Sequence, residues 1–199
     1  MKLFTRRFYK NFKEIQHEFV GKMIKYMEIG VFLGDTSEWM LNNVLTHKDS
    51  ELVGIDPWIW FKPQHKRFPT EQDWKTKVLD RIDALSDKYA PKAKFIKGFS
   101  QDVLRNVKWA DHSFDLIYID GHHTIQSVLR DYVHTWPLLK IGGVMIFDDY
   151  LQGSSDQVNI AVNCILQGLD GRRKGIHIRD TKYELLFKNY QVGIRKLAE

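Results

Sequence analysis

Short apolar runs that alternate with segments of helical period constrain the fold of this chain more than any other feature. The apolar runs lie at residues 25–30, 51–56, 92–98, 114–120 and 144–149. Strands that alternate with helices indicate βαβ units, which build a mostly parallel sheet covered by helices on both faces. The expected fold class is therefore α/β, a Rossmann-like three-layer sandwich.

Two further apolar runs, at residues 175–179 and 183–188, are joined by a turn that is too short for a crossover helix. We expect them to pair antiparallel, which gives a seven-stranded sheet with an antiparallel C-terminal hairpin. Gly142 and Gly143 are natural residues for ending the helix before the fifth strand. Helices are expected at about 9–24, 35–45, 71–89, 123–139 and 155–168, with a short one between 98 and 114.

The size of the chain favours one domain. Its 199 residues, 43% of them hydrophobic, can bury one sizeable core. The sequence shows no internal repeat, low-complexity tract or Gly/Ser linker. We expect a single domain over residues 1–199, with an N-terminal helix at about 9–24 and a core at about 25–188.

The sequence also bears on location and partners. No stretch approaches the ~20 consecutive apolar residues that span a bilayer, and the N-terminal segment lacks the apolar region of a secretory signal. The single cysteine, Cys164, excludes an internal disulfide and fits a reducing compartment, so we expect a cytoplasmic protein. The net charge is +5, and a basic cluster precedes Glu14. Such a cluster can meet nucleic acid or an acidic membrane, but a solvated helix face is the commoner explanation.

Three aspartates end two of the most apolar runs. Asp120 follows the run FDLIYI, and Asp148 and Asp149 follow VMIF. If these strands are neighbours, their ends lie only ~5 Å apart, and the carboxylates repel one another unless a positive charge lies between them. Oxygen ligands grouped in this way suit a divalent ion such as Mg²⁺. The alternative is that the aspartates merely cap the helix or turn that follows.

Three other segments resemble parts of a cofactor site. The first strand contains Glu28-x-Gly30-x-x-x-Gly34, in which glycines allow a tight turn beside a cofactor. Asp56 ends the second strand, where it can accept hydrogen bonds from ribose hydroxyls or simply shape the turn before Pro57. The third strand leads into GFSQD at 98–102, where Ser100 or Asp102 can cap a helix.

Together, in this order, these segments resemble the class I S-adenosylmethionine-dependent methyltransferases from about Met27 to Tyr150. They are most similar to the metal-dependent O-methyltransferases, including catechol O-methyltransferase and the macrocin (sugar) O-methyltransferase group. The GFSQD, YIDG and FDDY motifs carry most of the specificity. The resemblance implies S-adenosylmethionine and Mg²⁺, or another divalent cation, as cofactors, and these cofactor-binding residues: Glu28, Gly30, Gly34, Asp56, Trp58, Ser100, Gln101 and Asp120.

Within this resemblance, Glu28 and Gly30 would contact the methionine half of the cofactor, Asp56 the ribose, and Ser100 and Gln101 the adenine. The metal ligands would be Asp120, Asp148 and Asp149.

His123 lies three residues beyond Asp120, where catechol enzymes place a catalytic lysine. With an ordinary pKa of about 6.5 it suits a general base, but it could also only pack at the start of the helix or support a ligand. Asp120 and His123 are thus the expected catalytic residues. The catechol enzymes usually have Asn at the last metal position and the macrocin group has Asp, as here at Asp149. A sugar or glycan hydroxyl is therefore the expected acceptor, and a small phenol or catechol the alternative.

The segment 57–74 is rich in aromatic and basic residues. It could form a lid that stacks on a sugar ring, or pack as a satellite core, or make a contact in a homo-oligomer.

Three other classes of function were weighed. A nucleic-acid methyltransferase is not expected, because YIDGHH stands where amino-group methyltransferases carry an Asn/Asp-Pro-Pro-aromatic motif. An NAD-dependent dehydrogenase would have the third fingerprint glycine and no need of paired aspartates. A non-catalytic cofactor-binding module stays open as an alternative, although it would have no reason to retain charged residues at the strand ends.

Overall fold

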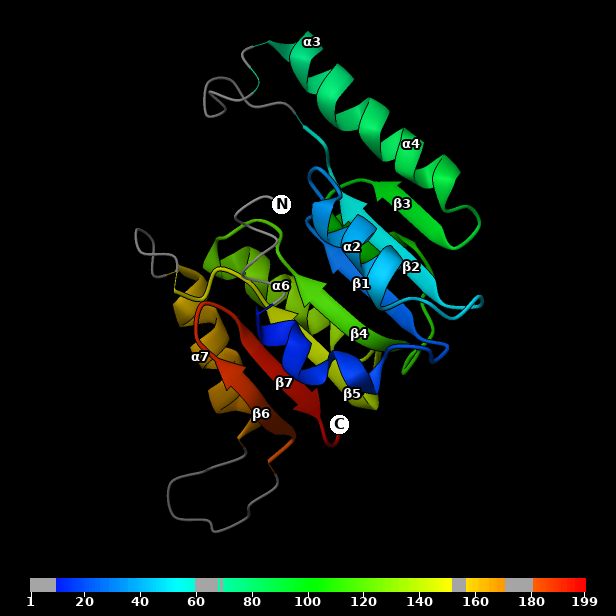
Figure 1. Cartoon of the computed structure of the whole chain (residues 1–199). Helices are drawn as coiled ribbons and strands as arrows, with labels where there is room; N and C mark the ends of the chain where they lie inside the picture. The colour runs from blue at the N-terminus through cyan, green and yellow to red at the C-terminus, as the bar shows by residue number, and fades with distance from the viewer. Residues whose placement is uncertain (1–9, 60–67, 69, 152–156, 171–180) are drawn as a thin grey trace.

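The computed structural model describes residues 10–59, 68, 70–151, 157–170 and 181–199 (Figure 1). All its strands join one seven-stranded sheet in the order β3-β2-β1-β4-β5-β7-β6. Strands β1 to β5 run parallel, whereas β7 is antiparallel to both β5 and β6. The strands are β1 Lys25–Ile29, β2 Glu51–Asp56, β3 Ala93–Lys97, β4 Phe114–Ile119, β5 Leu139–Phe147, β6 Tyr183–Lys188 and β7 Val192–Lys196. The expected fold class is confirmed.

Helices cover both faces of the sheet. One apolar core joins the sheet to α5, α6 and α7, and a second joins its other face to the helix at residues 10–15 and to α2. A third, smaller cluster lies under α3 and α4. The helices are α2 Asp35–Asn43, α3 Glu71–Trp74, α4 Asp80–Lys88, α5 Ser100–Asn106, α6 Ile125–Thr135 and α7 Gln157–Leu169, with a π-helical turn Lys75–Leu79 between α3 and α4. No helix among the described residues is long and apolar enough to cross a membrane.

The N-terminal helix is shorter than expected. It covers residues 10–15 and continues only as a 3-10 turn, Gln16–Glu18. Gly21 has a left-handed backbone with a φ of 77°, which ends helical geometry well before the expected residue 24. The long helix expected at 71–89 is confirmed as the continuous run from α3 to α4.

The expected role of Gly142 and Gly143 is wrong. Helix α6 ends at Thr135, because Pro137 follows closely and cannot continue a helix. Strand β5 then begins at Leu139, so both glycines lie within the strand. The pairing of β4 with β5 shifts register between Phe114 and Leu116, which accommodates the irregular first half of β5.

The C-terminal hairpin differs from the expected one. The expected strand at 175–179 lies outside the described residues, and the partner of β6 is instead β7. This strand was missed because VGIRK is short and has a glycine in its interior, where the ring of Phe187 occupies the space of a side chain. The sheet therefore continues to Lys196, past the expected end of the core at 188.

Candidate active site

The carboxyl ends of β1, β4 and β5 lie side by side, because β4 pairs with both of the others. Ile119 and Phe147 are register partners, so the residues that follow them lie at the same edge of the sheet. Asp120 comes directly after β4, and Asp148 and Asp149 come directly after β5. The expectation that the two strands are neighbours is confirmed, so the three aspartates follow strand ends at one edge of the sheet. The side chains that converge there are those of Asp120, His123 and Asp149, and Asp148 is not part of that group.

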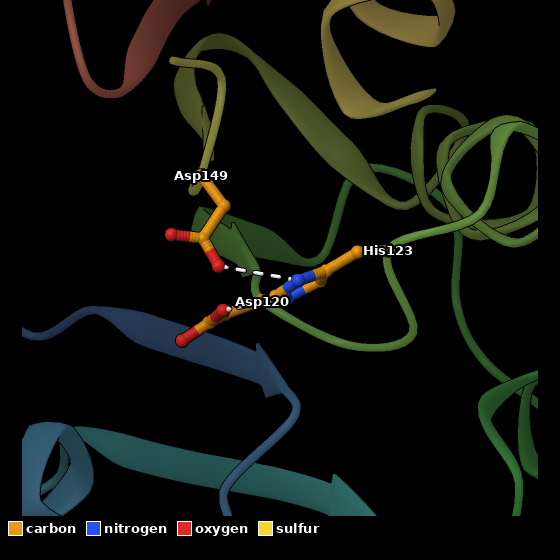
Figure 2. Close-up of side chains that lie close together, drawn as sticks. All are labelled: Asp120, His123 and Asp149. Atoms are coloured by element: carbon orange, nitrogen blue, oxygen red, sulfur yellow. Dashed lines mark ion pairs between the residues drawn. The ribbon is translucent and has the colours of Figure 1, made fainter. Parts of the chain in front are cut away.

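Asp120 and Asp149 converge on the imidazole of His123 (Figure 2). His123 Nδ1 lies 3.2 Å from Asp149 Oδ2, and Nε2 lies 3.5 Å from Asp120 Oδ1. One ligand atom from each of the three residues lies within 4.8 Å of the others. Figure 2 shows the ring between the two carboxylates, so these side chains could share one positive charge, either a proton or a metal ion.

The backbone at Asp149 explains how two consecutive aspartates can serve one site. Side chains alternate between the faces of a strand, so Asp148 and Asp149 would normally point apart. Asp148 still follows the strand, and its amide donates to Ile119 O. Asp149 has a φ of 55°, a left-handed conformation that aspartate tolerates better than most residues. Beyond this turn, the Asp149 carboxylate reaches His123.

Asp148 is held differently from the other two aspartates. Its Oδ2 accepts a 2.6 Å hydrogen bond from the Tyr118 hydroxyl. Its Oδ1 is buried and has no hydrogen-bond partner among the described residues. A buried acceptor without a partner costs about 1–3 kcal/mol, and a bound cation would remove this cost. The gathered carboxylates of Asp120 and Asp149 are oxygen ligands of the kind that a divalent ion takes, and Asp148 directly precedes Asp149 in the chain.

Burial and the repulsion of neighbouring carboxylates raise the pKa values of Asp120 and Asp148. For Asp120 the largest cause is burial, followed by the charge of Asp148. Burial also raises the pKa of Asp148. The pKa of His123 is raised by its hydrogen bond to Asp120 and by the surrounding carboxylates. These directions agree that the site favours the binding of a positive charge, either a proton or a cation.

The family is shown by the sequence of the sheet region. Residues 27–150 match the model of a family described as a methyltransferase domain, which is more than half of the chain. The chain belongs to this methyltransferase family. It is 28% identical over 170 residues to the uncharacterised protein R132 of Acanthamoeba polyphaga mimivirus, covering 82% of this chain and 70% of that protein.

Solved structures show the same fold for the methyltransferase. A candidate rRNA methylase from Clostridium thermocellum has a TM-score of 0.62 at 14% identity, covering 96% of this chain and 95% of that one. The MycE methyltransferase of the mycinamycin pathway, solved with Mg and S-adenosylhomocysteine, has a TM-score of 0.55 at 14% identity, covering 98% of this chain and 50% of that one. The family and fold together identify a methyltransferase that uses S-adenosylmethionine.

Glu28 lies inside the methyltransferase rather than on the open edge of the sheet. Only 1% of it is exposed, and its Oε2 accepts hydrogen bonds from Ser37 Oγ at 2.6 Å and from the Tyr26 hydroxyl at 3.2 Å. Burial raises the pKa of Glu28 to about 8, although the hydrogen bond from Ser37 opposes the shift. Its contact with the methionine half of the cofactor stays a prediction.

Replacing Glu28 by Gln is expected to flatten the pH dependence of stability. The Glu28 pKa is about 8 in the folded protein and near its ordinary 4.5 in the unfolded chain. Its contribution to stability is therefore complete below pH 4.5 and is lost as the pH rises to 8, by up to ~1.4 kcal/mol per pH unit. Urea denaturation at pH 5 and pH 8 measures the free energy of unfolding. Relative to the wild type, Glu28→Gln should be more stable at pH 8 than it is at pH 5. The exposed-site control Glu14→Gln should show no such gain, and a parallel pH dependence in both variants would contradict the expectation.

The two glycines of the first loop have different roles. Gly30 has a φ of 89°, and a Cβ there would collide with the backbone carbonyl of Asp120. Gly34 precedes α2, and a Cβ there would meet the side chains of Ile82 and Leu85 on α4. Gly30 thus lets the ends of β1 and β4 approach each other, whereas Gly34 mainly makes room for α4. A contact of either with the cofactor stays a prediction.

Asp56 ties two loops together at the end of β2. Its Oδ2 accepts from Phe32 N at 2.9 Å and its Oδ1 from Trp58 N at 2.7 Å. Trp58 is 5% exposed, and its indole Nε1 donates to Phe32 O at 2.9 Å. The structure therefore supports the turn-shaping role of Asp56. Trp58 packs in the aromatic cluster below α3 and α4, and cofactor contacts by these two residues stay predictions.

Neither Ser100 nor Asp102, the two caps that the sequence offered, is the N-cap of α5. The N-cap of α5 is Phe99, which makes no side-chain cap, and Ser100 is the first helical residue. Ser100 Oγ instead donates a 2.6 Å hydrogen bond to Asp131 Oδ1. Gln101 follows it and is half-buried. The adenine contacts expected of Ser100 and Gln101 stay predictions.

Asp131 was missed from the sequence. It lies on the buried face of α6, is 2% exposed, and its pKa is raised by burial to about 6. The sequence did contain a signal for this residue. Asp131 lies three residues after Val128 and four before Thr135, a spacing that places an acid on the buried face of an amphipathic helix. A buried carboxylate beside the start of α5 supports the loop where the adenine is expected.

Aromatic residues of the segment 57–74 form a satellite core. Phe68 and Trp74 pack edge to face, with ring centroids 5.3 Å apart, and both contact Phe32. Together with Trp58 they fill the space below α3 and α4. The basic residues at 62 and 65–67 lie outside the described residues, so the expected lid stays a prediction.

Proposed function

We propose that this methyltransferase transfers the methyl group of S-adenosylmethionine to a hydroxyl of a sugar or glycan, with a divalent cation such as Mg²⁺ held by Asp120, Asp148 and Asp149. The observation that carries the proposal is the convergence of Asp120 and Asp149 on His123. Asp148, whose buried Oδ1 has no hydrogen-bond partner among the described residues, adjoins Asp149 in the chain. This set lies at the carboxyl edge of the sheet, directly beside Gly30 and its loop.

Methyl transfer from a sulfonium is an in-line displacement, in which the acceptor oxygen forms a bond to the methyl carbon as the sulfur leaves. Much of the rate comes from holding the two reactants in line. Asp120, Asp148 and Asp149 would hold the cation, which would supply Lewis-acid chemistry that lowers the pKa of a hydroxyl. Gly30 keeps the cofactor loop close to Asp120.

His123 is the proposed base that removes the acceptor proton. Its ring lies within 3.5 Å of both carboxylates, so these two residues fix its orientation. Without a cation the same carboxylates raise the pKa of His123 and favour its protonated form. A cation between them would offset their charge and return His123 to a state that can accept a proton.

A sugar hydroxyl is preferred over a phenol because the last acid of the set is Asp149 rather than an amide. A second carboxylate adds negative charge around the cation, which suits an acceptor that arrives as a neutral hydroxyl. Small phenols and catechols remain the second choice. A non-catalytic cofactor-binding module is disfavoured, because crowded buried carboxylates cost stability without serving it.

Calorimetric titration of S-adenosylhomocysteine, with and without Mg²⁺ and then with EDTA, tests this proposal. We expect micromolar binding and a separate Mg²⁺ heat that Asp149→Ala abolishes. A panel of sugars and catechols with S-adenosylmethionine then identifies the acceptor by the S-adenosylhomocysteine formed. Cofactor binding without any response to Mg²⁺ would reject the cation, and transfer to catechols but not to sugars would reject the acceptor.

A further inference from the structure

A buried chain of hydrogen bonds connects the N-terminal helix to Asp148. Asn11 Nδ2 donates to Gln191 Oε1 at 3.0 Å, and Gln191 Nε2 donates to the Tyr118 hydroxyl at 3.4 Å. Tyr118 in turn donates to Asp148 Oδ2 at 2.6 Å. These residues come from the helix at 10–15, the β6–β7 turn and the middle of the sheet, so only the complete fold assembles them.

Each bond in this chain determines the direction of the next. An amide side chain has one acceptor end and one donor end. Asn11 occupies the acceptor end of Gln191, so the donor end of Gln191 faces Tyr118. The hydroxyl oxygen of Tyr118 accepts that bond, so its single hydrogen is directed to Asp148. These bonds therefore fix Oδ2 as the oxygen of Asp148 that accepts from Tyr118.

The same turn also holds the second carboxylate. The hydroxyl of Tyr190 donates to Asp149 Oδ1. Its neighbour Asn189 forms a reciprocal amide pair with Asn11, with bonds of 2.7 and 2.8 Å. Each carboxylate is thus bonded by its own tyrosine: Tyr118 donates to Oδ2 of Asp148, and Tyr190 donates to Oδ1 of Asp149. The second oxygen of Asp149 faces His123.

The hydrogen-bonded residues of this network are buried, at positions where packing alone would favour apolar side chains. Asn11 is 5% exposed, and Gln191 and Tyr118 are each 1% exposed. Fully bonded polar networks in a low dielectric make a structure rigid and specific, and partly bonded ones are costly. Metal-binding carboxylates are commonly oriented by such outer hydrogen bonds. Orientation of Asp148 and Asp149 is therefore what this network can contribute beyond packing.

We propose that Asn11, Gln191, Tyr118 and Tyr190 are positioning residues that orient Asp148 and Asp149 for the cation. The inference rests on the proposed function, since it requires that these two aspartates hold a metal ion. It adds that the N-terminal helix and the β6–β7 turn, which are far from the cofactor loops in sequence, set the strength of that site.

Mn²⁺ titration, followed by the electron paramagnetic resonance signal of free Mn²⁺, tests this inference on the wild type and on Tyr118→Phe and Asn11→Leu. We expect Tyr118→Phe to weaken Mn²⁺ binding by about 10- to 100-fold, and Asn11→Leu to weaken it in the same direction by less. The affinity for S-adenosylhomocysteine, measured by calorimetry, should stay within about twofold. The Tyr118 hydroxyl donates to Asp148, whereas Glu28 accepts from Tyr26 and Ser37 and Asp56 accepts from Phe32 and Trp58.

Ser50→Ala is the matched control. Ser50 is also 1% exposed and hydrogen-bonded, accepting from Ile24 N and donating to Lys22 O, but it lies at the opposite end of the sheet, before β2. It should lower the melting temperature and leave Mn²⁺ affinity unchanged.

The outcomes separate the two proposals. A wild type that binds no Mn²⁺ would overturn the cation site itself and this inference with it. A wild type that binds Mn²⁺, with Tyr118→Phe binding it equally well, would overturn only the inference. If Asn11→Leu does not fold, Tyr118→Phe decides, because it removes a single hydroxyl from an otherwise unchanged ring.

Discussion

Asp148→Asn is expected to lower kcat/KM for methyl transfer by at least about 10²-fold, a typical effect of losing one preorganised charge at a reacting centre. The amide oxygen can still accept the bond from Tyr118, so the substitution places an NH₂ group at the position of the open Oδ1. This NH₂ repels a cation where the carboxylate attracted it. Binding of S-adenosylhomocysteine should change little.

The same substitution should make the protein more stable at neutral pH. Burial raises the pKa of Asp148, so ionisation of this carboxylate is less favourable in the folded protein than in the unfolded chain. Asparagine removes that cost, and the melting temperature at pH 7.5 should rise while Mn²⁺ binding is lost. The exposed-site control Asp111→Asn should change neither property. Full activity in Asp148→Asn would contradict the metal role of Asp148.

Gly30→Ala is expected to destabilise the protein by more than about 3 kcal/mol. The added Cβ would meet the Asp120 carbonyl and the Gly121 amide, which are backbone atoms that cannot rotate away. The positive φ adds a further cost of about 1–2 kcal/mol. Relief would require the ends of β1 and β4 to separate, which would also displace Asp120. Urea denaturation measures the loss, and retained Mn²⁺ and S-adenosylhomocysteine binding would argue against the displacement.

Gly142→Ala provides the matched comparison. Gly142 has a similar φ of 84°, but among the described residues only its own chain neighbours lie within 4 Å of the place that a Cβ would take. The substitution should therefore cost only the conformational part, about 1–2 kcal/mol. Equal losses at the two glycines would show that the close contact with Asp120 is not what requires Gly30.

The edge of carboxylates could be predicted from the sequence because its signals are local. Each acid directly follows an apolar run, and parallel strands place all their carboxyl ends on one side. Asp120 and the pair at 148 and 149 were therefore assigned to one edge, and the register of β4 with β5 confirms this. The mostly parallel class of the sheet followed from the alternation of strands and helices in the same way, whereas the strand order was not predicted.

What could not be predicted depends on contacts between distant residues or on single backbone angles. The left-handed φ of Asp149 turns its carboxylate toward His123, and nothing in the motif FDDY encodes that angle. Asn11 bonds to side chains 178 and 180 positions away. Trp58 packs in the cluster formed with α3 and α4, and its two-residue distance from Asp56 in the sequence does not indicate that packing. Each of these features is decided by the complete fold.

The position of β7 has a consequence for the order of assembly. Although β7 follows β6 in the chain, it lies inside the sheet, between β5 and β6. The outer edge of β5 is therefore unpaired until residues 192–196 arrive, and an unpaired edge is where a growing chain is most exposed to association with its neighbours. Tyr190 and Gln191 directly precede β7, so the step that closes this edge also delivers the donor to Asp149 and the donor to Tyr118, which bonds Asp148. Metal binding would then be possible only after the last step of folding. Folding intermediates that lack β7 in the sheet would be prone to aggregate and unable to bind the ion.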